Sequence, residues 1–219
     1  MIAVTALGYD AYLTGWKDYI WYYSDWSSMF TLLTVISISY AYFIPTYTSS
    51  YDYFISSLFE VTLPLNMVVT LMYWGAYFTP SMLNWSDPDT YARPFLLHVL
   101  PLVVMLIEWS LNNIQFNYYY TFLYLIYIYL CYIPLTYIGK DFLGFYAYSF
   151  INYNMDSFSA FIWTPIYLGA VFFMHIGFYW ATAIPTNFIK AHMGSGNPTL
   201  HEEVKVDFSH SFEDILSAF

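Results

Sequence analysis

The sequence predicts an all-α integral membrane protein, a bundle of about five transmembrane helices, and three observations lead to this fold class. Hydrophobic residues make up 59% of the 219-residue chain, whereas charged residues make up only 9%. An ordinary soluble domain carries about 25% charged residues, so this chain could not cover a water-facing surface. Apolar stretches long enough to cross a bilayer also recur along the chain.

Five such stretches are predicted to be membrane spans. Each is mostly apolar and reaches the length of about 17 residues or more that a bilayer requires. Pro101 lies inside the third span, where neighbouring helices can satisfy the carbonyl that a proline leaves free. The spans cover residues 27–47, 55–78, 94–110, 118–138 and 158–184.

The rest of the chain divides into two flanking segments around the bundle of residues 27–190. Residues 1–26 mix aspartates and a lysine with aromatic residues, which predicts a segment lying at the membrane interface. This segment lacks the features of a cleaved signal or a mitochondrial presequence. Residues 191–219 turn polar and predict a short C-terminal tail.

Charge and cysteine content exclude several kinds of partner. The net charge of −10 and the lack of a basic patch exclude nucleic acid, and the apolar spans indicate membrane lipids instead. The single cysteine, Cys131, excludes an internal disulfide and a cysteine-based metal site. Lys17, Arg93 and Lys140 fall on one side of a five-span bundle, which predicts that the N-terminus lies on the cytosolic or matrix side.

Polar groups inside the spans are the candidate functional residues, because a titratable group in lipid is costly. His98 and Thr31 each lie about four residues inside a span from the same side of the membrane, counted along helices that rise about 1.5 Å per residue. The two side chains can therefore lie at one depth. They can also meet across a helix interface, although both side chains could simply satisfy their own helices.

A second group of polar residues falls toward the opposite leaflet. Glu60, Glu108 and His175 are predicted to form an intramembrane polar cluster. Such a cluster could lock helices together, carry protons or hold zinc or iron, since carboxylates and imidazole are ligands of both metals. No local spacing supports a metal site, and no glycine-rich or nucleophile-elbow motif indicates a cofactor.

The third span resembles a family motif. In PFLLHVLPLVVMLIEW, His98 is followed at once by a V-L-P step, and Glu108 stands ten residues after the histidine. Three further pieces agree in order: DWSSMFTLLTVIS, LMYWGAYFTP and IGKDFLGFYAYSFINYN. Together, across about residues 26–185, they make the chain similar to the androgen-induced-gene family of multispan membrane hydrolases and its rolling-stone-like relatives.

The resemblance implies an intramembrane threonine hydrolase of lipid esters, including branched fatty-acid esters of hydroxy fatty acids. Carried onto this sequence, the nucleophile is Thr31, with Thr34 as an alternative register, and the base is His98. A threonine hydroxyl is a weak nucleophile until such a base takes its proton. Neither a cofactor nor a resident metal is implied, and the endoplasmic reticulum or another endomembrane is the expected location.

Two other function classes fit the sequence. The chain could be a non-catalytic accessory or scaffold subunit of a larger membrane complex, such as a respiratory assembly of the mitochondrial inner membrane. It could also be a proton or metabolite carrier that uses Glu60, Glu108 and His175. The surroundings of the His98 imidazole discriminate between these classes. A hydrolase needs that imidazole free to reach a hydroxyl, whereas a scaffold would bury it under another side chain or leave it facing a partner.

Overall fold

A computed structural model gives the fold and describes most of the predicted bundle. Residues 1–18 of the predicted interfacial segment lie outside the described residues, as does the predicted tail beyond Gly194. The described residues are 19–44, 49–82, 84, 86–112, 114, 116, 118–144, 147–148 and 158–194.

The described part of the chain is helical and contains no strand, which confirms the predicted all-α class. Three helical stretches, Tyr23–Phe43, Tyr51–Gly75 and Thr90–Leu111, are long and apolar enough to cross a membrane. The elements in chain order are η1 (Tyr19–Trp21), α2 (Tyr23–Phe43), α3 (Ser49–Met72), the π-helix η2 (Tyr73–Tyr77), η3 (Pro80–Met82), α4 (Pro88–His98), α5 (Leu100–Leu111), α6 (Tyr118–Leu143) and α7 (Phe158–Gly194).

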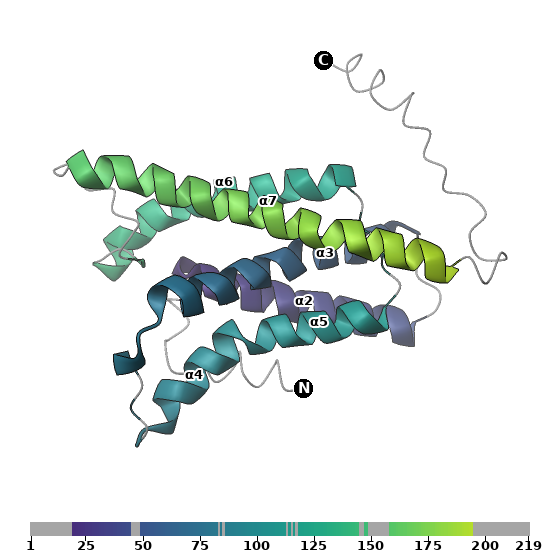
Figure 1. Ribbon diagram of the computed structural model, residues 1–219, viewed down its shortest axis with the longest axis horizontal. Coiled ribbons are helices and arrows are strands. Elements are labelled where there is room, and N and C mark those ends of the chain that lie inside the picture. The colour runs from purple at the N-terminus through teal and green to yellow at the C-terminus, as the bar shows by residue number, and fades with distance from the viewer. Residues whose placement is uncertain are drawn as a thin grey trace, which may run out of the picture.

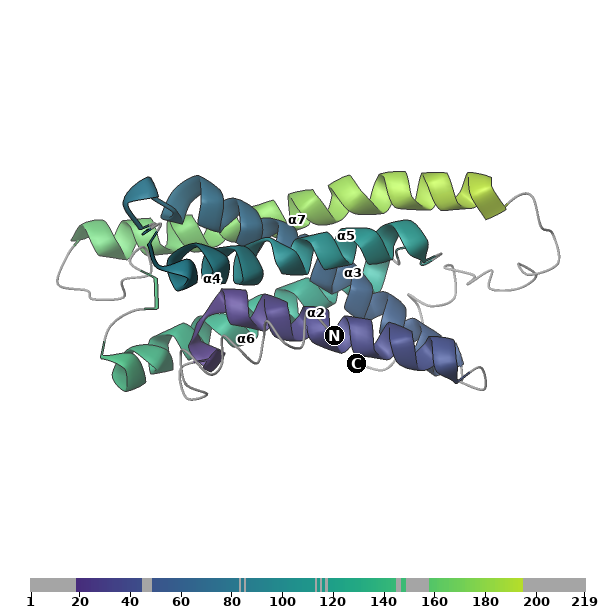
Figure 2. The same ribbon diagram turned by 90° about the horizontal axis from the view of Figure 1, so that it is seen from below.

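Helix α3 is the central element. Nearly every residue from Ile55 to Val69 is buried, because α2, α5, α6 and α7 all pack around this helix (Figures 1 and 2). Such all-round burial needs a helix that is apolar on every side, as most of the α3 sequence is. The side chains of α2, α5, α6 and α7 that face inward therefore all pack against α3.

Helix α2 has its polar face inside and its apolar face outside. Met29, Leu33 and Ile36 are exposed along one side. The opposite side is buried and consists mainly of small hydroxyl residues. A water-facing helix shows the reverse pattern, whereas membrane helices pack through small and hydroxyl residues and leave large apolar ones to lipid. The pattern of α2 therefore fits a membrane location.

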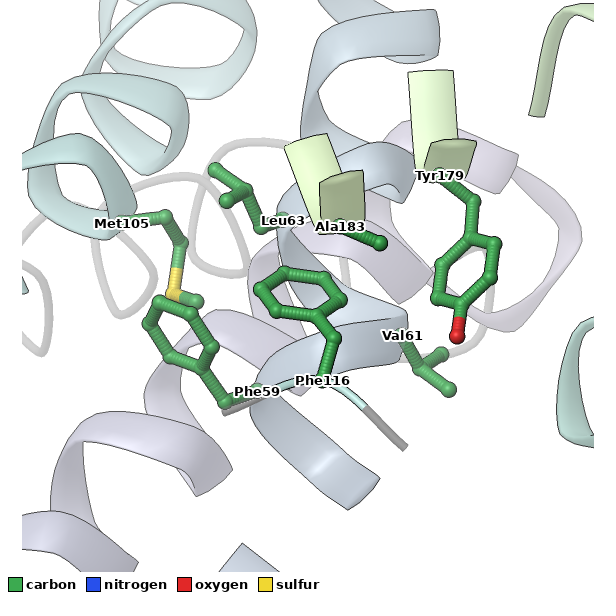
Figure 3. Close-up of a cluster of buried hydrophobic side chains, with 7 residues drawn as sticks. All are labelled: Phe59, Val61, Leu63, Met105, Phe116, Tyr179 and Ala183. Carbon is green, nitrogen blue, oxygen red and sulfur yellow. The ribbon is translucent and has the colours of Figure 1, made fainter. Parts of the chain in front are cut away.

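A buried hydrophobic cluster joins α3 to α5, α7 and the α5–α6 connection (Figure 3). At its centre lies Phe116, whose ring centroid is 6.2 Å from that of Phe59 and 5.9 Å from that of Tyr179. These ring contacts hold α3, the α5–α6 connection and α7 next to one another. The cluster consists of Phe59, Val61, Leu63, Met105, Phe116, Tyr179 and Ala183.

The helix ends differ from the predicted span limits by several residues along the chain, and three of these differences change the description of the bundle. Helix α2 begins at Tyr23, inside the predicted interfacial segment. The third span is broken between α4 and α5 at Val99. Helix α7 continues to Gly194, and its 37 residues extend about 55 Å, well beyond the hydrocarbon thickness of about 30 Å.

Candidate functional site

The α2–α3 interface is a row of hydrogen-bonded polar side chains. The hydroxyl oxygens of Thr34 and Thr62 are 2.9 Å apart. One turn along, Nδ2 of Asn66 donates to the hydroxyl of Thr31 over 2.8 Å. The Thr31 hydroxyl in turn donates to the backbone carbonyl of Ser27 over 2.8 Å. Such bonds hold membrane helices together because water is not available as an alternative partner.

His98 occupies the break between α4 and α5. It is the last residue of α4, and Val99 leaves ideal helix geometry at φ −116° and ψ −48°. Pro101 contributes to the break because it has no N–H to donate to the preceding turn. The hydroxyl of Thr70 on α3 donates to the carbonyl oxygen of His98, which ties the break to the central helix.

The His98 ring packs closely on one aromatic neighbour and leaves one nitrogen without a bond. Its centroid is 3.7 Å from that of Tyr73, the first residue of the π-helix η2. Within the part of the chain that the structure describes, His98 Nδ1 is buried and has no hydrogen-bond partner. π-Helical turns occur often at functional sites, and here the turn positions the aromatic face against the imidazole.

Thr31 and His98 contact successive turns of α3 but do not bond each other. Thr31 bonds Asn66, and the His98 carbonyl bonds Thr70, four residues or about 6 Å further along α3. Among the described residues, both bonds of the Thr31 hydroxyl are made with Ser27 and Asn66. Within the described part of the chain, the predicted pair therefore lies along α3 without a hydrogen bond between the two residues, and the pairing stays a prediction.

Ser28 is a second hydroxyl on α2 that the structure brings toward this region. Its side chain is 3% exposed, and no described residue makes a hydrogen bond with its Oγ. Helix α2 packs against α4 as well as α3. A buried hydroxyl without a partner costs about 1–3 kcal/mol, so its position requires an explanation.

The residues of the predicted cluster, Glu60, Glu108 and His175, lie on three different helices, α3, α5 and α7. His175 is buried, and its Nε2 lies 3.0 Å from the hydroxyl of Tyr23 while its Nδ1 lies 2.9 Å from the carbonyl oxygen of Val171. Glu60 is fully buried in α3, whereas Glu108 is partly exposed on α5.

The metal alternative also lacks support in this cluster. Across the described ranges, no three His, Cys, Asp or Glu side chains lie close enough to hold a metal ion. Depth along a helix does not determine which side of the helix faces a neighbour, so the grouping of these three residues stays a prediction.

The α2 N-terminus is capped by a tyrosine from a distant segment. The hydroxyl oxygen of Tyr148 accepts a hydrogen bond from the backbone N–H of Tyr23 over 3.0 Å. A longer bond of 3.4 Å comes from the N–H of Ser24. Burial raises the pKa of Tyr148 to about 12, so this phenol stays protonated at physiological pH. The cap holds the hydroxyl-bearing first turns of α2 in place.

Four residues of this site, Ser28, Asn66, Thr70 and Tyr73, were not predicted from the sequence. Asn66 had a visible signal, because an amide inside the apolar run LPLNMVV needs a partner. Ser28 and Thr70 had little signal, since hydroxyl residues are common in membrane helices. Tyr73 is one of 26 tyrosines and could not be distinguished from the others.

No protein-family model, no curated protein and no solved structure matches this chain. The functional argument therefore depends on the geometry of the site and on the chemistry of its residues.

Proposed function

We propose that the chain is a membrane-embedded hydrolase of lipid esters in which His98 is the general base. The observation that carries this proposal is the buried Nδ1 of His98, which no described residue bonds. An imidazole that served only to connect helices would have both nitrogens satisfied, as His175 has. An unsatisfied buried nitrogen costs about 1–3 kcal/mol, and such a cost is tolerated where a group must react.

The surroundings of His98 suit ester hydrolysis. The buried face of α2 offers several hydroxyls, including Thr31, the nucleophile that the family resemblance implies. A neutral imidazole nitrogen can take the proton of a hydroxyl as its oxygen attacks an ester carbonyl. The apolar outer faces of the helices suit a substrate whose acyl chains lie in lipid. The resemblance points to the endoplasmic reticulum or another endomembrane as the location.

The proposed arrangement has five spans, with α6 and α7 crossing the membrane beside the three apolar stretches described above. In a five-span chain, the α3–α4 connection and the tail face opposite sides. In a Cys131→Ser background, cysteines at exposed Ser86 and at Ser195 should react with an impermeant maleimide from opposite sides of sealed vesicles. Reaction from the same side would exclude the odd number of spans.

The test of hydrolysis is active-site labelling of the purified chain with a fluorophosphonate probe, together with turnover of a fatty-acid ester of a hydroxy fatty acid. Wild type should react and turn over ester, and His98→Ala should lose both by at least about a thousandfold, as expected when a base is removed. Ser37→Ala is the matched control, because Ser37 is a buried α2 hydroxyl at a distance from His98. Equal labelling of wild type and His98→Ala would reject the proposal.

A second candidate is an accessory subunit of a larger membrane complex. One observation favours it: the ring of Tyr73 lies against the His98 ring at 3.7 Å, as expected for an imidazole used in packing. In that case the chain should co-migrate with other subunits in native gels of detergent-solubilised membranes. It should also show no ester turnover. Ester turnover by the purified chain would exclude a solely structural role.

A further inference from the structure

Two buried polar atoms, Oγ of Ser28 on α2 and Nδ1 of His98 at the end of α4, have no hydrogen-bond partner among the described residues. The third such atom, Nδ2 of Asn112, lies at the other end of the third span, after α5. A serine hydroxyl and an imidazole nitrogen form the usual nucleophile and base of hydrolases. Their coincidence in one region is therefore informative.

The register of α2 against α3 places Ser28 near the level of His98. Thr34 faces Thr62 and Thr31 faces Asn66, so the residue number falls along α2 as it rises along α3. The next turn of this antiparallel pair brings Ser27 and Ser28 opposite Thr70. Thr70 is the residue that bonds the His98 carbonyl.

Ser28 also lies on the side of α2 that faces α4 and α5, the helices between which His98 is placed. The residues of α2 that pack toward Tyr132 of α6 are Tyr23, Trp26 and Phe30. Ser28 precedes Phe30 by two residues and is separated from it by about 160° on the helical wheel, so it faces away from α6. Helices α4 and α5 lie on the side of α2 opposite α6 in Figure 1, and both pack against α2.

The proton of Ser28 is available, whereas that of Thr31 is engaged. Thr31 donates its proton to the Ser27 carbonyl and accepts a bond from Asn66, so its hydroxyl has a donor and an acceptor already. The Thr31 hydroxyl must break its hydrogen bond to the Ser27 carbonyl before a base can take that proton. Ser28 makes no such bond within the described part of the chain.

We propose that Ser28, and not Thr31, is the nucleophile that works with His98 on a lipid ester; this inference rests on the proposed hydrolase function. The Ser28 oxygen bonds to the ester carbonyl carbon while its proton passes to the His98 imidazole. The ester C–O bond then breaks, and the departing alcohol oxygen receives that proton from His98. This step leaves the acyl group bonded to Ser28 as an acyl-serine. Water attacks the acyl-serine, gives one proton to His98 and releases the fatty acid as Ser28 regains its proton.

In this scheme Thr31 is a positioning residue. Its bond with Asn66 fixes α2 against α3 and thereby sets the height of Ser28 relative to His98. Thr31→Val retains the shape of the side chain and removes the hydroxyl. The variant should therefore keep the site of probe attachment and reduce turnover far less than Ser28→Ala does.

The deciding experiment maps the site of attachment of a fluorophosphonate probe on the purified full chain by peptide mass spectrometry. The probe should attach to Ser28, and Ser28→Ala should lose both attachment and ester turnover by about a thousandfold or more. Thr31→Val and the control Ser37→Ala should still be labelled at Ser28. Each variant is compared with wild type by its thermal unfolding in detergent, so that loss of fold is not mistaken for loss of the nucleophile.

Two results would overturn the inference in different ways. Attachment at Thr31, with Ser28→Ala as active as wild type, would reject Ser28 and keep the hydrolase. Absence of attachment and of ester turnover in folded wild type would reject the hydrolase itself. Ser28→Cys in a Cys131→Ser background adds a second readout, since His98→Ala should slow alkylation of the new thiol if the imidazole lies beside it.

Discussion

The hydroxyl of Tyr23 and Nε2 of His175 lie 3.0 Å apart, which joins the first turn of α2 to the middle of α7 across 152 positions of sequence. The direction of this bond follows from the other nitrogen. Nδ1 of His175 lies 2.9 Å from the Val171 carbonyl, which can only accept, so Nδ1 carries the proton. Nε2 of the neutral ring then accepts from the Tyr23 hydroxyl. The bond therefore links two helices that are distant in the sequence.

Tyr23→Phe should lower stability by about 1–3 kcal/mol, because it leaves a buried imidazole nitrogen without its donor. Unfolding of the purified chain in mixed micelles, followed by circular dichroism, measures the change. Tyr42→Phe is the control, since Tyr42 is 83% exposed. An unchanged midpoint for Tyr23→Phe would contradict the role assigned to this bond.

The bond between Thr31 and Asn66 should appear as an energetic coupling across the α2–α3 interface. In a double-mutant cycle with Thr31→Val and Asn66→Leu, we expect a coupling of about 0.6 kcal/mol and at most about 1.7 kcal/mol, the range found between membrane helices. The same unfolding assay supplies the four free energies. Strictly additive effects would mean that the two side chains do not interact.

Gly139→Ala should destabilise the chain by about 1–3 kcal/mol, because the new methyl group overpacks the α6 surface. A Cβ at this position would lie 2.8 Å from Cε3 of Trp21. Trp21 cannot easily move away, since it is buried and stacked on Phe142. Gly177→Ala is the matched control on α7, where a Cβ meets nothing within 4 Å. Equal stability of the two variants would contradict the close α6–Trp21 contact.

Alkaline pH should destabilise the chain in part through Tyr148. Burial raises its pKa to about 12 in the folded chain, compared with about 10 for an unfolded tyrosine. Unfolding therefore releases a proton from Tyr148 at pH values between about 10 and 12. The contribution of Tyr148 to the free energy of unfolding is fully present below pH of about 10 and is lost as the pH rises through about 12. Tyr148→Phe should show a shallower loss of stability over this range than wild type and Tyr42→Phe. Parallel profiles would contradict the burial of this phenol.

The helices were predictable because lipid imposes a simple rule on sequence. A helix that crosses the hydrocarbon needs an unbroken apolar run, and the runs around Leu33, Leu65 and Leu102 correspond to α2, α3 and α5. The break at Val99 also had a signal in Pro101, although a proline inside a membrane helix does not require a break.

The partners of the polar residues were not predictable, because hydropathy gives depth but not rotation or lateral order. Nothing in the sequence indicates that Nε2 of His175 bonds the hydroxyl of Tyr23. The sequence places Thr31 at the depth of His98, whereas the described bonds of its hydroxyl are made with Ser27 and Asn66. Each of these side chains has a partner on another helix, and the order of the helices depends on contacts such as Phe116 against Phe59 and Tyr179.

The polar row on the inner face of α2 has a consequence for biogenesis. If α2 entered the bilayer alone, Thr31 and Thr34 would face acyl chains, whereas Thr62 and Asn66 provide their partners only after α3 has left the ribosome. The connection between the two helices is short, residues 44–48. Helices α2 and α3 are thus suited to leave the translocon laterally as one hairpin, and a long spacer inserted after Ile44 should delay stable integration of α2.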